Sequence, residues 1–95
     1  MDYNILANRL GDEYKDVITY CDLYKSSGNG IFRDIAREEM THAKHIENIL
    51  KESGKLSDLH QDVKKQAEEA LAEIWIPIPI HKHILNIVEI ISLFL

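Results

Sequence analysis

The sequence predicts an all-α protein built on an antiparallel helix hairpin. Two stretches place apolar residues at alternating intervals of three and four, the spacing of one face of an α-helix. Between them lies a run of Ser, Gly and Asn, residues 26–30, which is typical of a helix-stopping loop. Because this loop is short, the two helices are expected to be antiparallel neighbours.

The first helix is expected over residues 2–26. Its interior glycine, Gly11, costs about 1 kcal/mol relative to alanine, which a helix of this length tolerates. The stripe expected to face the second helix comprises Tyr3, Leu6, Leu10, Glu13, Val17, Tyr20 and Tyr24.

The second helix is expected over residues 31–52, where strong helix formers such as Ala36 and Ala43 are frequent. It should stop at the pair Ser53 and Gly54. Its inner stripe is expected to comprise Phe32, Ile35, Glu39, His42, Ile46 and Ile49.

A third helix is expected over residues 57–74, capped by Ser57 or Asp58. Pro77 and Pro79 then hold the chain extended, and a mostly apolar tail, residues 81–95, follows. This tail is too short for a transmembrane helix of about 20 residues, so we expect it to pack on protein. The sequence thus divides into a hairpin domain, 1–54, and an accessory helix with its tail, 55–95. The apolar side of the third helix is expected to comprise Leu59, Val63, Ala67, Ala70, Leu71 and Ile74.

Three polar residues, Glu13, Glu39 and His42, interrupt the two apolar stripes. A buried carboxylate costs several kcal/mol unless it is paired, protonated or bound to a cation. Glu39 and His42 are three residues apart and project from the same side of a helix. A turn centred near Gly28 puts both within a few residues of the level of Glu13, at about 1.5 Å of rise per residue. The three side chains are therefore candidate metal ligands; the alternative is a Glu and a His that face water.

A Glu-x-x-His motif with a lone Glu on the neighbouring helix is half of the ligand set of a carboxylate-bridged di-iron bundle. The chain holds one such set. Two chains would complete the site, so we expect a homodimer, or a multiple of dimers, that forms a four-helix bundle.

The run Ile35–Ala43, IAREEMTHA, resembles the second-helix signature of rubrerythrin and ferritin-like proteins. In their first helix a ligand Glu is followed seven residues later by a Tyr, matched here by Glu13 and Tyr20. The resemblance covers about residues 3–52. The chain has one ligand set and lacks a Cys-x-x-Cys pair, so it is more similar to encapsulated ferritins and small phage-type ferritin-like proteins, which are single hairpins that dimerise.

The resemblance implies a di-iron site shared between two chains, with metal ligands Glu13, Glu39 and His42 and a catalytic, near-metal tyrosine at Tyr20. The Tyr20 phenol could hydrogen-bond a ligand carboxylate and position it; the alternative is that Tyr20 packs in the core. The implied function is oxidation of Fe(II) with O2 or peroxide, as a ferroxidase, in iron handling, or as a peroxide-scavenging oxidoreductase. An encapsulating shell or another protein could bind the tail. The alternative, from a different class, is a non-catalytic helical module that binds a partner through the apolar stripes and the tail.

Composition limits the remaining classes. The net charge of −5 argues against nucleic-acid binding, and no secretory signal opens the chain. The single cysteine, Cys21, forms no intramolecular disulfide and favours a reducing, cytoplasmic location. Asp16 and His45 are expected at the surface. His81 and His83 alternate in an extended stretch and could bind a metal, but no third ligand lies near them in the sequence.

Overall fold

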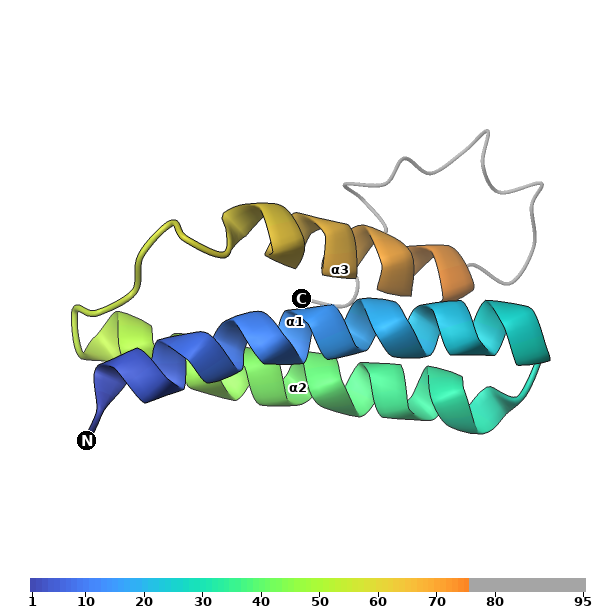
Figure 1. Ribbon diagram of the computed structural model, residues 1–95, viewed down its shortest axis with the longest axis horizontal. Helices are drawn as coiled ribbons and strands as arrows, with labels where there is room; N and C mark the ends of the chain where they lie inside the picture. Colours follow the sequence, from blue (N-terminus) through green and yellow to red (C-terminus); the bar gives the residue numbers. More distant parts are fainter. Residues whose placement is uncertain (76–95) are drawn as a thin grey trace.

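The protein is described here from a computed structural model, in which residues 1–75 are placed. They form three helices and no strand: α1 (Tyr3–Ser27), α2 (Gly30–Glu52) and α3 (Gln61–Trp75). Helices α1 and α2 are antiparallel neighbours, and α3 runs along the side of α1 in the same direction as α1 (Figure 1). The prediction of an all-α fold built on a helix hairpin is confirmed.

Side chains and one glycine set the ends of the hairpin helices. Asp2 Oδ1 accepts hydrogen bonds from the backbone N–H groups of Asn4 and Ile5 at the start of α1. Gly28 ends α1 in the left-handed conformation, φ 70°, and its N–H donates to the Tyr24 carbonyl. Asn29 then accepts from the Ile31 N–H and caps α2. The connection is therefore two residues long, which forces the helices to pack side by side.

The prediction that the third helix begins at residue 57 is wrong, because α3 begins at Gln61. The Ser57 hydroxyl accepts a hydrogen bond from the Leu59 N–H, and the Asp58 carbonyl accepts one from the Gln61 N–H, so residues 57–60 form a turn. Leu59, expected on the apolar side, is 74% exposed.

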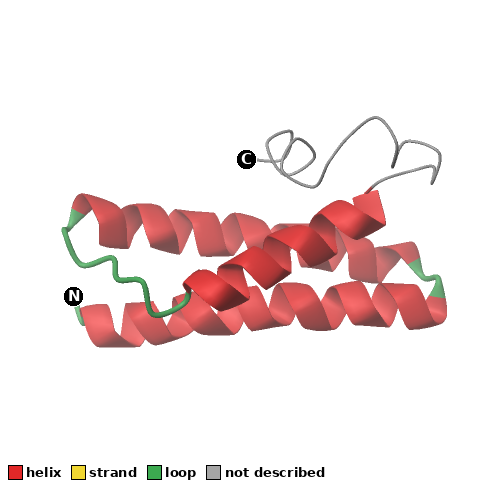
Figure 2. Cartoon of the chain, turned by 90° about the horizontal axis from the view of Figure 1, so that it is seen from above, coloured by secondary structure: helices red, strands yellow, loops and turns green. Residues whose placement is uncertain are grey.

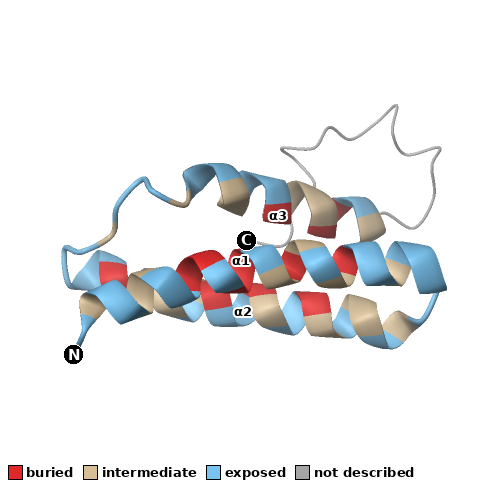
Figure 3. Ribbon diagram, viewed as in Figure 1, coloured by how far each residue is buried: buried red, intermediate tan, exposed pale blue. Residues whose placement is uncertain are grey.

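The buried residues lie where the three helices face one another (Figure 3). Ala36, Ala43 and Ala67 are completely buried, and such small side chains let neighbouring helices approach closely. The core comprises Leu10, Tyr14, Val17, Cys21, Ala36, Met40, Ala43, Leu50, Ala67 and Leu71.

The predicted inner stripe of α2 is wrong by one position around the helix. The residues that α2 buries are Ala36, Met40, Ala43 and Leu50. The residues of the predicted stripe are not in the core. They lie at the edge of the hairpin, where they are partly buried or exposed. We call this edge of the hairpin the open face. It comprises Glu13 and Tyr20 of α1 and Ile31, Phe32, Ile35, Glu39, His42, Ile46 and Ile49 of α2.

Helix α3 packs against the other edge of the hairpin, which it crosses at an angle in Figure 2. Its Lys64 pairs with Glu47 of α2, and its Glu73 pairs with Lys25 of α1 at 2.9 Å. Lys25 therefore lies on the side of α1 that faces α3. At about 100° per residue, Glu13 points more than a quarter turn away from Lys25 around α1. The open face is therefore left uncovered by α3.

No helix among residues 1–75 is long and apolar enough to cross a membrane. The predictions for the proline-containing stretch, the apolar tail, and His81 and His83 lie outside the described residues. The division at residue 54 stays a prediction.

Candidate metal-binding cluster

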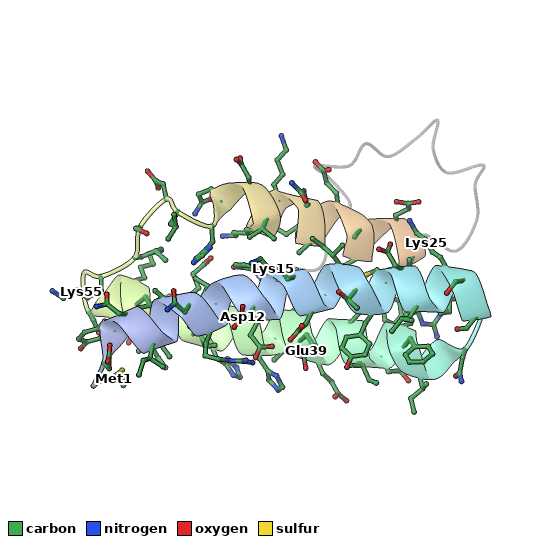
Figure 4. All side chains as sticks on the ribbon, in the orientation of Figure 1. Met1, Asp12, Lys15, Lys25, Glu39 and Lys55 are labelled. Atoms are coloured by element: carbon green, nitrogen blue, oxygen red, sulfur yellow. The ribbon has the colours of Figure 1, made fainter. Side chains whose placement is uncertain are left out.

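Helices α1 and α2 bring Glu13, Glu39 and His42 together on the open face, with one ligand atom of each within 4.8 Å of the others. His42 Nδ1 lies 3.8 Å from Glu13 Oε2 and 3.7 Å from Glu39 Oε1. In Figure 4, Glu39 lies on α2 next to α1, on the side away from α3. The predicted meeting of these three side chains at one level of the hairpin is therefore observed.

Burial falls steadily across the cluster from the core to the solvent. Glu13 is 5% exposed, the side chain of Glu39 is 18% exposed and that of His42 is 56% exposed. The cluster is thus anchored in the core at one end and open at the other, so an ion can reach it from solution.

The two oxygens of Glu13 have different surroundings. Oε1 forms an ion pair with the Arg9 guanidinium, one turn earlier on α1. Oε2 is buried, faces His42 and has no hydrogen-bond partner among residues 1–75 as long as both carboxyl groups of the cluster are ionised. Burial opposes ionisation of Glu13, but interactions with Glu39, Arg9 and His42 outweigh it, and the pKa of Glu13 is lowered.

The neighbouring carboxyl group shifts in the opposite direction. Its hydrogen bond with Glu13, then burial and the charge of Glu13, raise the pKa of Glu39 to about 7. Two close carboxylates cannot both ionise freely, so they share a proton near neutral pH. A cation bound between them would take the place of that proton.

Two carboxylates and one imidazole suit a divalent transition-metal ion. Three protein ligands also leave coordination positions free for water or for a further ligand. The geometry therefore supports a metal-binding cluster with an incomplete coordination sphere.

Tyr20, predicted to lie near the metal, stacks on Phe32 with 6.3 Å between ring centroids and 21° between ring planes. Its phenol makes no hydrogen bond to the cluster within residues 1–75, and a catalytic role for Tyr20 stays a prediction. His45 is exposed, as expected, whereas Asp16 is partly buried.

Sequence reasoning missed a polar network that joins all three helices. The Tyr14 hydroxyl donates a hydrogen bond of 2.8 Å to Glu47 Oε2, and Lys64 Nζ lies 3.0 Å from Glu47 Oε1. Burial opposes ionisation of Glu47, yet the contacts with Lys64 and Tyr14 prevail and lower its pKa. Sequence reasoning also missed the Arg9 contact with Glu13, although their spacing of four is itself a signal for an ion pair.

Residues 25–70 match the sequence model of the family described as CagY type 1 repeat. The match takes in the end of α1, all of α2 and most of α3, just under half of the 95 residues. Searches of curated proteins and of solved structures found no match. The chain is thus similar, over this segment, to a repeat family.

This finding overturns the resemblance to ferritin-like and rubrerythrin proteins, because the matched segment contains Glu39 and His42 and is that of a different family. The ferroxidase and peroxide-scavenging oxidoreductase function predicted from that resemblance is wrong as well. The physical reason lies in the motif itself. Any antiparallel hairpin with Glu-x-x-His level with a Glu builds this cluster, so the pattern reports helix register and not family membership.

Proposed function

We propose that the chain is a helical interaction module that associates with a second copy of itself through the open face. The similarity of residues 25–70 to a repeat family supports this proposal. A repeat unit usually cannot bury its apolar face alone and covers it with a neighbouring unit.

The open face has the composition that such an interface needs. Ile31 is 56% exposed and Ile49 is 38% exposed, although both are large and apolar. They are 18 residues apart, five full turns of α-helix, so they point in the same direction from α2. His42 lies close to the same line. A two-fold axis through this face would pair like residues and bring two clusters together, because a two-fold interface uses the same patch on both chains.

Sedimentation of the full chain tests the interaction. The double variant Ile31→Lys/Ile49→Lys should be monomeric at concentrations where the wild type is a dimer, with unchanged helical circular dichroism. Leu59→Lys is the matched control, because Leu59 is exposed and apolar but lies in the turn before α3. A monomeric wild type, or a double variant that still dimerises, contradicts the proposal.

We also propose that Glu13, Glu39 and His42 bind a divalent metal ion. The observation that supports this second function is the buried Glu13 Oε2, which faces His42 and accepts no hydrogen bond when both carboxyl groups of the cluster are ionised. The proposal rests on this chemistry and not on a family. A di-iron centre completed by two chains is the form predicted from the sequence, and the metal content of the dimer tests it.

Calorimetric titration with Co(II), Zn(II), Mn(II) and, without oxygen, Fe(II) tests metal binding. Glu39→Gln and His42→Ala should each reduce affinity by at least tenfold. Glu38→Gln and His45→Ala are matched controls, because each removes the same chemistry from an exposed neighbouring position on α2. If the controls lose as much affinity as the cluster variants, the ion binds elsewhere.

A further inference from the structure

The inference concerns the ion pair between Arg9 and Glu13, and it depends on the metal site proposed above. Glu13 directs Oε2 toward His42 and Oε1 toward Arg9, and Glu39 lies in the same cluster. A bound ion and the guanidinium would therefore lie at opposite ends of one carboxylate group. From this geometry we infer that Arg9 is an internal counter-cation that competes with the metal ion for Glu13.

The charges of the cluster support competition. When both carboxyl groups are ionised, Glu13 and Glu39 carry two negative charges, and the Arg9 guanidinium balances one of them. A divalent ion balances both carboxylates alone, so the guanidinium becomes an excess positive charge next to it. The guanidinium and the metal ion, both positive and both next to the Glu13 carboxylate, repel each other, and this repulsion weakens metal binding.

The position of Arg9 lets it leave Glu13. Its side chain is 51% exposed, whereas that of Glu13 is 6% exposed, so Arg9 approaches the carboxylate from the solvent side. Asp12 Oδ2 lies 4.0 Å from the second terminal nitrogen of Arg9 and is itself exposed, which provides an alternative partner. The guanidinium can therefore move away from the ion without losing every carboxylate contact.

A competing counter-cation and an orienting residue predict opposite results. If Arg9 only held Glu13 in place for the metal, its removal would weaken binding, as happens when a residue that hydrogen-bonds a metal ligand is lost. If Arg9 competes, its removal strengthens binding. The salt dependence of metal affinity also distinguishes the two roles of Arg9, because salt screens the repulsion from a half-exposed charge.

Titration of the full chain with Co(II), read by calorimetry and by the visible absorbance of the bound ion, tests the inference. At low salt, Arg9→Gln should bind Co(II) about three- to tenfold more tightly than the wild type, a gain that shrinks at high salt. Arg9→Lys keeps the charge and should bind like the wild type. Lys15→Gln is the matched control, since it removes one positive charge from α1 at an exposed position on the side nearer α3 (Figure 4).

The outcomes also separate this inference from the metal site itself. Equal or weaker Co(II) binding by Arg9→Gln, with a wild type that binds, overturns the competition and leaves the site standing. An equal gain in Lys15→Gln overturns it too, because the effect would then come from net charge. If neither the wild type nor Arg9→Gln binds Co(II), the metal site is wrong and the inference falls with it. Binding by Arg9→Gln alone supports both.

Discussion

The imidazole of His60 lies directly against the backbone of Gly11. A Cβ atom added to Gly11 would be 2.7 Å from Cε1 and 2.9 Å from Nδ1 of that ring, closer than real Cβ contacts. Packing therefore explains the glycine inside α1, because the absence of a side chain at Gly11 lets His60, the residue before α3, approach the hairpin. His60 Nε2 is buried and has no hydrogen-bond partner within residues 1–75.

Gly11→Ala should destabilise the protein despite alanine's better helix propensity. The propensity gain is about 1 kcal/mol, whereas displacing a packed ring typically costs 1–3 kcal/mol, so we expect a net loss of about 1 kcal/mol. Urea denaturation measures the change. Gly30→Ala is the matched control, because nothing lies within 4 Å of a Cβ at that position.

A second variant shows whether the clash is the cause. In the His60→Ala background the ring is absent, and Gly11→Ala should then stabilise the protein by its helix propensity. If Gly11→Ala destabilises both backgrounds equally, the contact with His60 does not explain the glycine.

The hydrogen bond from Tyr14 to Glu47 should stabilise the junction of the three helices. Tyr14 is 1% exposed, and its hydroxyl donates to a carboxylate, a type of bond that contributes about 1.5–3 kcal/mol. Tyr14→Phe should lower the free energy of unfolding by about that amount. Tyr20→Phe is the control and should have little effect, because the Tyr20 phenol makes no hydrogen bond within residues 1–75. Equal losses in the two variants would assign the effect to the change of ring and not to the bond.

The hairpin was predictable because its signals are local. The capping residues Asp2 and Asn29 and the left-handed Gly28 determine where α1 begins and ends and where α2 begins, and all lie next to those ends. The three cluster residues follow from the same hairpin register. For this reason the cluster could be placed from the sequence alone.

The buried stripe of α2 was misassigned because the prediction favoured large side chains. Ile35 and Ile46 suggested one face, yet the buried face is the one that carries Ala36 and Ala43 between Met40 and Leu50. Small side chains on that face allow a closer approach of the helices. The contact of Glu47 with Lys64 depends on where α3 packs, and no short-range pattern determines that. Helix periodicity was also too weak a signal to separate the turn at 57–60 from α3.

Without metal, the protein should lose stability as the pH rises through the range in which Glu39 titrates. The pKa of Glu39 is about 7 in the folded chain and lies near its ordinary value of 4.5 in the unfolded chain. Between these values the folded state binds more protons, so the free energy of unfolding falls as pH rises. Glu39→Gln should remove this part of the pH dependence, measured by urea denaturation from pH 4.5 to 8 with a chelator present.

The comparison needs a control for other acidic groups. Glu38→Gln, at an exposed position one residue earlier, should keep the wild-type profile. If the wild type and Glu39→Gln have parallel profiles, Glu39 holds no extra proton in the folded state. Added metal ion should reverse the trend in the wild type, because binding favours the ionised carboxylates.

Cys21 should report the opening of the interface between α1 and α3. The thiol is completely buried in the core, so a reagent cannot reach it in the folded protein. Burial also raises its pKa to about 11, so little of the reactive thiolate is present. Under native conditions a thiol reagent should label it only when the protein opens, and the rate should rise in the Gly11→Ala variant, which weakens the packing of the segment before α3. Tyr20→Phe, on the open face, should leave the rate unchanged. Rapid labelling of the native wild type, at the rate of an exposed thiol, would contradict the packing of α3 against this part of α1.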